Sequence, residues 1–422
     1  MRNFLLVIIT FTGFLALALL VGLTWVVSKP VDIMPLARYV LPITVAEGTT
    51  KDKPAGKLIF DKLTLYWPLL GKGFQTPISL TFKNLKIVNN KGQVADFIQQ
   101  GKVELALLPL LKGKIVPYKL AVGDMQFRLK RDQDKQLVLD LPDIHNNPET
   151  NKISFDLHHL KRLEIQNAQT SLSDEVLHKK IQIKIQSADI QPFYYQGALG
   201  AIGHIHIQGN AEGRQLSFSA QSDAFNSTKS AKDLLSSSGL INWNIRAQTF
   251  NPSDFAQLMP SLKVFESLNL PVSFDANFKL GARKENAYLM PLQADMRLNL
   301  GKGIFSMDNY RLFISSGTSH ARMFFSNSFD DPIKIELTDT KLKLLAPDQL
   351  AKENSGPIFD FQVKINLSSL LHTQHTTIQL NAHSPKLDFA TLKNYWPSMV
   401  AKGAYEWVTN NMTHGTANNF RI

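Results

Sequence analysis

Alternation between apolar and polar side chains is the main pattern from about residue 58 to residue 383. Its clearest example is the run Lys-Ile-Gln-Ile-Lys-Ile-Gln at residues 180–186, where every apolar residue falls on one side. A period of two is typical of a β-strand with one apolar and one polar face. The same alternation predicts further strands at residues 216–220, 274–280, 333–337, 341–344 and 359–365.

Short turn sequences separate these runs, such as Asn90-Lys91-Gly92 and the segment 209–213. Successive strands joined by such turns are typical of antiparallel meanders and not of βαβ units. Helical patterning is scarce. We expect a brief helix at 94–99, a helix at 254–265 and one or two short helices within 391–409. The predicted fold is therefore mainly β, an antiparallel sheet with a few short helices.

An apolar sheet face must be buried against something, and the sequence leaves two solutions open. In a sandwich, a second sheet covers the apolar face, which then forms the core. In the other solution, one long, elongated sheet curls around its own apolar face and leaves a β-groove. On alternation alone, the candidate lining of such a groove is Ile181, Ile183, Ile185, Ile205, Ile207, Phe218, Phe274, Phe278, Phe359, Phe361, Val363 and Ile365.

An uncharged apolar run precedes all of these strands, from Phe4 to Val27. As a helix it would be roughly 36 Å long, enough to cross a hydrocarbon core of about 30 Å. A cleaved secretory signal is the competing interpretation, but the candidate cleavage sequence at 16–18 lies inside the run instead of ending it. We therefore predict an uncleaved transmembrane signal-anchor at 4–27, with residues 1–3 in the cytoplasm and the C-terminal body outside.

Composition along the chain suggests further divisions. Residues 28–57 are rich in Pro, Gly and Thr and are predicted to form a stalk. An N-terminal β module is expected at 58–225, followed by a Ser-rich linker or loop at 226–238. The β-groove is expected to continue over 239–383. A Trp-containing helical segment and the start of a further strand are expected at 384–422.

The chain has a formal net charge of +11 but contains no block of basic residues interleaved with aromatics. Its Lys and Arg residues are spread along the sequence, so we expect no nucleic-acid partner; anionic lipid headgroups and a solvated surface are the two explanations left open. The chain has no Cys. This excludes disulfides, Cys-based zinc sites, iron–sulfur clusters and Cys nucleophiles.

Motifs of catalysis are missing from the sequence. It contains no Walker A, H-E-x-x-H or G-x-S-x-G sequence, and the glycines of 197–203 lead into a strand and are interpreted as a turn. His204 and His206 lie two apart on one strand and would share a face. This spacing allows either a metal site or two solvated side chains, and solvated side chains are favoured. No catalytic residue, metal or cofactor is predicted, and the protein is not expected to be an enzyme.

Several segments resemble a known family. Residues 85–142 resemble the N-terminal module of the AsmA-like family, in particular its larger YhdP-like members. The segment 247–255, and Tyr395-Trp396-Pro397 followed by Trp407-Val408, resemble further recurring segments of that group. The resemblance implies an anchor in the inner membrane of a Gram-negative bacterium and a periplasmic body with an elongated, curled, groove-forming β-sheet. It implies phospholipid transport between inner and outer membranes, which maintains the outer-membrane barrier, and no catalytic residues.

Large members of that family continue for many hundreds of residues beyond the segment that residues 395–415 resemble, so we expect this chain to be an N-terminal portion. The partners implied are phospholipids and the inner membrane, the latter through residues 4–27. The alternative function is that of a structural or chaperone-like factor in outer-membrane protein assembly, which would add outer-membrane or periplasmic assembly proteins as partners.

Overall fold

The computed structural model describes the chain in a series of ranges. They are residues 29–35, 44–45, 56–67, 77–89, 94–107, 109, 116–131, 137–139, 160–174, 179–211, 214–227, 230–254, 256, 265–282, 288–307, 310–326, 332–345, 356–368, 377–392, 394–396 and 402–421. The predicted anchor at 4–27 and much of the predicted stalk lie outside these ranges. Within them, no helix combines the length and the apolar character needed to cross a membrane.

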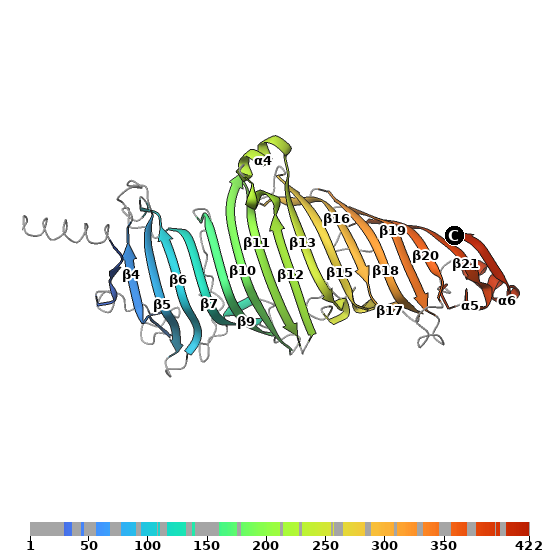
Figure 1. The fold of residues 1–422 in the computed structure, drawn as a ribbon, viewed down its shortest axis with the longest axis horizontal. Coiled ribbons are helices and arrows are strands. Elements are labelled where there is room, and N and C mark those ends of the chain that lie inside the picture. The colour runs from blue at the N-terminus through green and yellow to red at the C-terminus, as the bar shows by residue number, and fades with distance from the viewer. Residues whose placement is uncertain are drawn as a thin grey trace, which may run out of the picture. The chain divides into compact units, whose positions relative to one another are not determined.

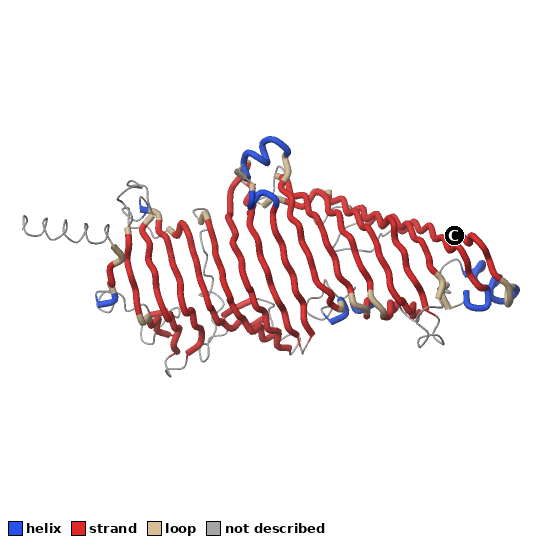
Figure 2. The backbone as a smooth tube through the Cα atoms, in the orientation of Figure 1, coloured by secondary structure: helices blue, strands red, loops and turns tan. Residues whose placement is uncertain are grey.

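The chain divides into two compact units, Met1–Phe193 (unit 1) and Tyr194–Ile422 (unit 2). Strands dominate the described residues of both units, and nearly all strand pairs are antiparallel. Helices are short and lie at the ends of strands (Figure 2). The prediction of a mainly β, antiparallel fold with a few short helices is confirmed.

Unit 1 is a sheet with five long strands among its described residues. Its strands are β1 (Val31–Asp32), β2 (Thr44–Val45), β3 (Gly56–Ile59), β4 (Lys62–Tyr66), β5 (Ile78–Asn89), β6 (Val94–Leu105), β7 (Pro117–Arg131), β8 (Leu137–Leu139), β9 (Arg162–Asp174) and β10 (Lys179–Tyr195). β5 pairs with β3 and β4 on one side and with β6 on the other, and the sheet continues through β7, β9 and β10. β1, β2 and β8 add short pairings to β4, β3 and β7.

Two predictions for unit 1 are wrong. The meander is broken once, because β7 and β9 pair in parallel. The brief helix predicted at 94–99 is instead the start of strand β6, which is hydrogen-bonded to a strand on each side. Two ladders of backbone hydrogen bonds outweigh the weak helical preference of six residues. Gly101 of β6 leaves room for a neighbouring ring, since an added Cβ would lie 2.1 Å from Phe82.

A line of polar residues crosses unit 1 in the middle of its strands. Asn84 in β5, Asp124 in β7 and Asn167 in β9 all have positive φ, between 50° and 52°. The pairing keeps one register on both sides of these residues, so they lie level with Gln99 and Gln186 on the strands between and beside them. Asn and Asp tolerate the left-handed region better than other residues with a Cβ. We call these positions the crease of unit 1.

Unit 2 is a sheet in which each long strand pairs with the long strand before it. Its strands are β11 (Ala198–Ala211), β12 (Arg214–Ser222), β13 (Ile241–Phe250), β14 (Leu268–Asn269), β15 (Val272–Gly281), β16 (Met290–Leu300), β17 (Gly303–Met307), β18 (Tyr310–Phe325), β19 (Ile333–Leu345), β20 (Ile358–Leu367), β21 (Thr377–Asp388) and β22 (Thr416–Arg421). Its long strands lie side by side in one layer (Figure 1).

This strand order distinguishes between the sandwich and the single long sheet in unit 2. A sandwich needs strands that pair in two separate sheets. Here the described strands from β11 to β22 all belong to one hydrogen-bonded series, and the short strands β14 and β17 pair within it as well. No second sheet is therefore formed by the described residues of unit 2 to cover its apolar face.

Helical segments were predicted with mixed success. Residues 226–238, predicted to be a linker or loop, contain helix α4 (Ala231–Ser238) after a 3-10 turn η2 (Asp223–Asn226). The Ser-rich sequence supplies a capping box between Ser230 and Asp233, and Gly239 ends the helix with a φ of 71°. Of the helix expected at 254–265, the first residue lies in the 3-10 turn η3 (Pro252–Asp254) and the last, Phe265, begins another 3-10 turn at 265–267. Most of the residues between them lie outside the described ranges.

The short helices predicted within 391–409 are confirmed. α5 (Phe389–Leu392) and α6 (Lys402–Asn411) stand between β21 and β22. The two strands predicted at 333–337 and 341–344 are one strand, β19, which stays continuous because Asp339 adopts a φ of 49° at a bulge.

Candidate functional site

Three rows of apolar side chains cross unit 2 on one face, each row containing residues directly opposite each other on successive strands. We name each row by its residue on β20. The Val363 row consists of Ile205, Ala220, Ile245, Ala276, Met296, Ala321, Leu337, Val363 and Leu380. It contains no polar residue over nine strands.

The other two rows flank the Val363 row at a spacing of two residues. The Phe361 row consists of Ile207, Phe218, Ala247, Phe274, Leu298, Ser319, Thr340, Phe361 and Ala382. The Ile365 row consists of Ser222, Trp243, Phe278, Ala294, Met323, Ile335, Ile365 and Ile378.

The structure brings together eight of the twelve candidate lining residues in these rows. They are Ile205, Ile207, Phe218, Phe274, Phe278, Phe361, Val363 and Ile365. Phe359 is on the same face but in a further row, with Val272, Leu300, Gly317 and Leu342. Alternation in the sequence therefore identified residues that share one face of the sheet, although the strands that contain them are far apart in the chain.

The remaining three candidates lie on β10, in the strand pair that ends unit 1. Ile181, Ile183 and Ile185 are opposite Leu172, Thr170 and Ala168 of β9. Thr170 is buried, and its hydroxyl has no hydrogen-bond partner among the described residues. This face of unit 1 is therefore less uniformly apolar than the three rows of unit 2.

Large and small side chains alternate along the rows. Ala220, Ala276 and Ala321 of the Val363 row stand between Ile, Met and Leu residues on the neighbouring strands, and are at most 7% exposed. Most of the large side chains beside them are only half-buried. Because the described strands of unit 2 form no second sheet, the large neighbours shield each Ala, and their own outer surfaces form the exposed part of the face.

Polar atoms within the rows are hydrogen-bonded inside the sheet. The hydroxyls of Ser319 and Thr340 bond each other at 2.7 Å, and the Ser222 hydroxyl accepts from the backbone N–H of Gly203 at 3.3 Å. The indole N–H of Trp243 donates to the carbonyl of Ala201 at 3.2 Å. A molecule lying on this face therefore meets hydrocarbon and aromatic surface, with these polar groups already paired.

The opposite face of the same sheet is charged and balanced. Asp295, Arg322, Glu336 and Lys364 lie directly opposite one another on four successive strands, with alternating sign. Such cross-strand pairs stabilise a solvated face. The hydrogen bond from Lys334, at 2.7 Å, lowers the pKa of Glu336.

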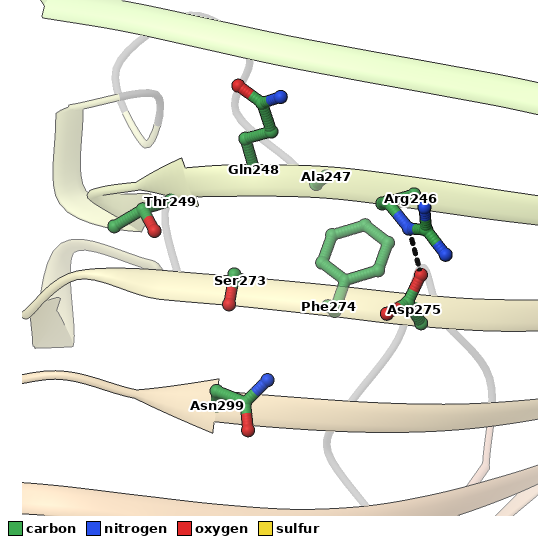
Figure 3. Close-up of a pocket in the computed structure, with 8 residues that line it drawn as sticks. All are labelled: Arg246, Ala247, Gln248, Thr249, Ser273, Phe274, Asp275 and Asn299. Carbon is green, nitrogen blue, oxygen red and sulfur yellow. Dashed lines mark hydrogen bonds and ion pairs between the residues drawn. The ribbon is translucent and has the colours of Figure 1, made fainter.

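The polar face also contains a surface depression that crosses β13, β15 and β16 (Figure 3). An ion pair between Arg246 and Asp275 lies at its edge. Its lining is mostly polar: Arg246, Ala247, Gln248, Thr249, Ser273, Phe274, Asp275 and Asn299. Ala247 and Phe274 also belong to the Phe361 row, but the other six lining residues are polar, a composition unsuited to an apolar ligand.

One part of the apolar face is covered, which the sequence did not predict. Leu392 of α5 and the following Tyr395 and Trp396 pack on Phe359 and Leu344 of the sheet. The connection between β21 and β22, which we call the α5–α6 segment, therefore covers the face at the Phe359 row. The signal available in the sequence was the cluster of aromatic residues at 395–407, but alternation alone gives no partner for it.

The histidine pair lies on the polar side of β11. The His206 ring contacts the Ser217 hydroxyl at 3.3 Å, and the His204 ring packs edge-on against Phe225. Within the described ranges, no group of three or more His, Cys, Asp or Glu side chains is arranged to hold a metal ion. Residues 196–197 form a turn, but the rest of the glycine-rich segment that was predicted to be a turn, residues 198–203, is the start of strand β11.

A scan against protein-family models and a search of curated proteins both return no match for this chain. The apolar face of unit 2, with its three rows and its covered end, is therefore the feature from which a function can be proposed.

Proposed function

We propose that this protein binds the acyl chains of phospholipids on the apolar face of unit 2 and contributes to phospholipid transport between two membranes. The observation that supports the proposal is the Val363 row with its two neighbours, an apolar surface that crosses nine strands and has no second sheet over it. The face acts by binding, and we propose no catalysis.

Hydrocarbon chains suit this surface better than a polypeptide does. An extended peptide lying on the rows would leave backbone N–H and C=O groups without partners on the sheet, because the polar groups of the rows are paired within it. An acyl chain has no such groups. Removing it from water stabilises the complex by about 0.8 kcal/mol for each buried CH₂ group.

The AsmA-like resemblance supports a wider setting for this binding. In that setting, residues 4–27 anchor the chain in the inner membrane, the body lies in the periplasm, and the sheet curls into a groove. Phospholipid headgroups would remain in water while their chains lie on the apolar rows. Transport along the groove would support the barrier of the outer membrane.

Adjacent residues on opposite faces of β20 provide a direct test. A photoreactive benzoylphenylalanine replaces either Val363, on the apolar face, or Lys364, on the polar face, in the full chain. Cells are grown with radioactive phosphate and irradiated, and the chain is purified under denaturing conditions. We expect a radioactive phospholipid adduct at position 363 and little at position 364.

Two results would contradict this proposal. Equal labelling at the two positions would indicate contact with lipid in bulk, and absence of an adduct at 363 would indicate that lipid does not occupy the face. Crosslinking of position 363 to outer-membrane proteins, without lipid, would instead favour the chaperone-like alternative.

A further inference from the structure

The α5–α6 segment is firmly packed on the apolar face. Tyr395 lies against Phe359 with 6.3 Å between ring centroids, and Phe359 stacks on Phe361 at 5.7 Å. Phe359 is 5% exposed and Leu392 2%. Close packing of this kind leaves no room for an additional hydrocarbon chain. The Phe359 row is therefore closed on β20.

Hydrogen bonds join the two ends of the segment to each other and its middle to the sheet. The N–H of Phe389 donates to the carbonyl of Gly415 at 3.0 Å, which joins the start of α5 to the residue before β22. The Tyr310 hydroxyl of β18 donates to the carbonyl of Asn394 at 3.4 Å. Trp396 packs edge-on against Tyr405 of α6, with centroids 6.2 Å apart. The two helices and the sheet thus form one packed unit.

Side chains become much more exposed within a few residues along β21, the strand that pairs with β20. On β21, Leu387 is 1% exposed, whereas Leu380 is 42% and Ile378 64% exposed. Leu380 lies opposite Val363, and Ile378 lies opposite Ile365. The Val363 and Ile365 rows are therefore exposed on β21, beyond the part of this strand that pairs with β22, whereas the Phe359 row is closed on β20.

We infer that the α5–α6 segment narrows the lipid-binding face at β20 and β21 to a lane formed by the Val363 and Ile365 rows, through which phospholipids pass in single file. This inference rests on the proposed function. Two rows stand about 7 Å apart, since they are two residues apart along each strand. Packed hydrocarbon chains approach to about 4 Å between contacting carbons, so the lane holds about the two chains of one phospholipid.

The test compares two positions on one strand in the full chain. Benzoylphenylalanine replaces either Phe359, under the α5–α6 segment, or Ile365, in the lane, and adducts with radioactive phospholipid are measured in irradiated cells. We expect about tenfold more adduct at position 365 than at position 359, because close packing excludes lipid from the covered row. Position 363 serves as the reference for lipid binding.

A second pair of variants tests the role of the segment itself. Trp396→Ala loosens its packing on the sheet, whereas Trp407→Ala removes an exposed side chain, 61% accessible, from the same segment. We expect Trp396→Ala to raise the adduct at position 359 and Trp407→Ala to leave it unchanged. Resistance to limited proteolysis, together with an unchanged adduct at position 363, confirms that each variant is folded.

Failure of the lane and failure of the proposed lipid binding would give different results in these experiments. Labelling at 363, with equal labelling at 359 and 365 in the otherwise unchanged chain, would overturn the lane while leaving lipid binding in place. No labelling at 363 or 365 would overturn the proposed function, and the lane with it.

Discussion

Single residues with a left-handed backbone shape the strands of unit 1. The Asn84 side chain donates to the Asp61 carboxylate at 2.7 Å, and Asn167 donates to Asp124 at 2.6 Å, so amide and carboxylate groups are paired along the crease. Each crease residue stands between two apolar residues, as Asn84 does between Phe82 and Leu85, and the strand register does not shift there.

Substitution of Asn167 tests how strongly the crease depends on residue type. Asn167→Val places a β-branched residue at a φ of 50°. We expect it to destabilise the protein by about 1–2 kcal/mol, because the Cβ of an L-residue is strained in this region. Urea unfolding measures the change. Gln169→Val, two residues further along β9 and also exposed, is the control and should change stability little. Equal losses in both variants would contradict the explanation.

Tyr310 provides a prediction for alkaline pH. Burial raises the pKa of its hydroxyl, and the nearby Tyr405 and Tyr395 raise it further. In the unfolded chain the hydroxyl has the ordinary tyrosine pKa of about 10. The folded state then retains a proton that the unfolded state loses, so the stability that this group contributes is complete below about pH 10 and falls as the pH rises.

We therefore expect the unfolding free energy to fall less between about pH 9 and pH 11 in Tyr310→Phe than in the unchanged chain. Urea unfolding at a series of pH values measures the slope. Tyr288→Phe, at a position 62% exposed, is the control and should follow the unchanged chain. If Tyr310→Phe followed it as well, burial of this hydroxyl would not be the cause.

At the scale of elements, alternation predicted strands well because it follows from geometry. Residues 180–186, 216–220, 274–280 and 359–365 all lie within strands of the structure. Helices were harder, because a helix of eight residues has few turns in which to show a period. The cap of α4 was visible in the sequence as Ser230 three residues before Asp233, but the Ser-rich composition favoured a loop.

The α5–α6 segment contains two Trp residues that should behave differently. Trp396 is 9% exposed and belongs to the cluster on the sheet, whereas Trp407 is 61% exposed. We expect Trp396→Ala to cost about 3–5 kcal/mol of stability, as for large side chains removed from a core. Trp407→Ala should change stability by less than about 0.5 kcal/mol. Urea unfolding distinguishes them, and similar losses would show that the segment is not packed as described.

At the scale of the molecule, the class of fold could be predicted, but its division could not. A break was expected at 226–238, where composition changes, yet the contacts divide the chain between Phe193 and Tyr194. That point lies inside strand β10, shortly before the turn at Gln196 and Gly197, and the sequence marked this place only as a turn that leads into a strand. The sequence also could not predict which rows of the apolar face are exposed. That depends on contacts between Phe359 of β20 and the later residues Leu392, Tyr395 and Trp396.

The N-terminal apolar run yields a prediction for the whole chain. If residues 4–27 act as an uncleaved anchor, the protein in membranes keeps its first residues and resists extraction at high pH. Mass spectrometry of the intact chain from membranes should therefore include Met1 or Arg2. A shorter mass, beginning after residue 18 or close to residue 27, would instead support a cleaved secretory signal.

The order of strands in unit 2 has a consequence for how the sheet forms. Each long strand from β12 to β21 pairs with the long strand made immediately before it, so its partner is already present when it is synthesised. Pairings that are close in sequence close short loops, which favours rapid folding. The sheet of unit 2 is thus able to grow one strand at a time, in the direction of synthesis, as the chain emerges.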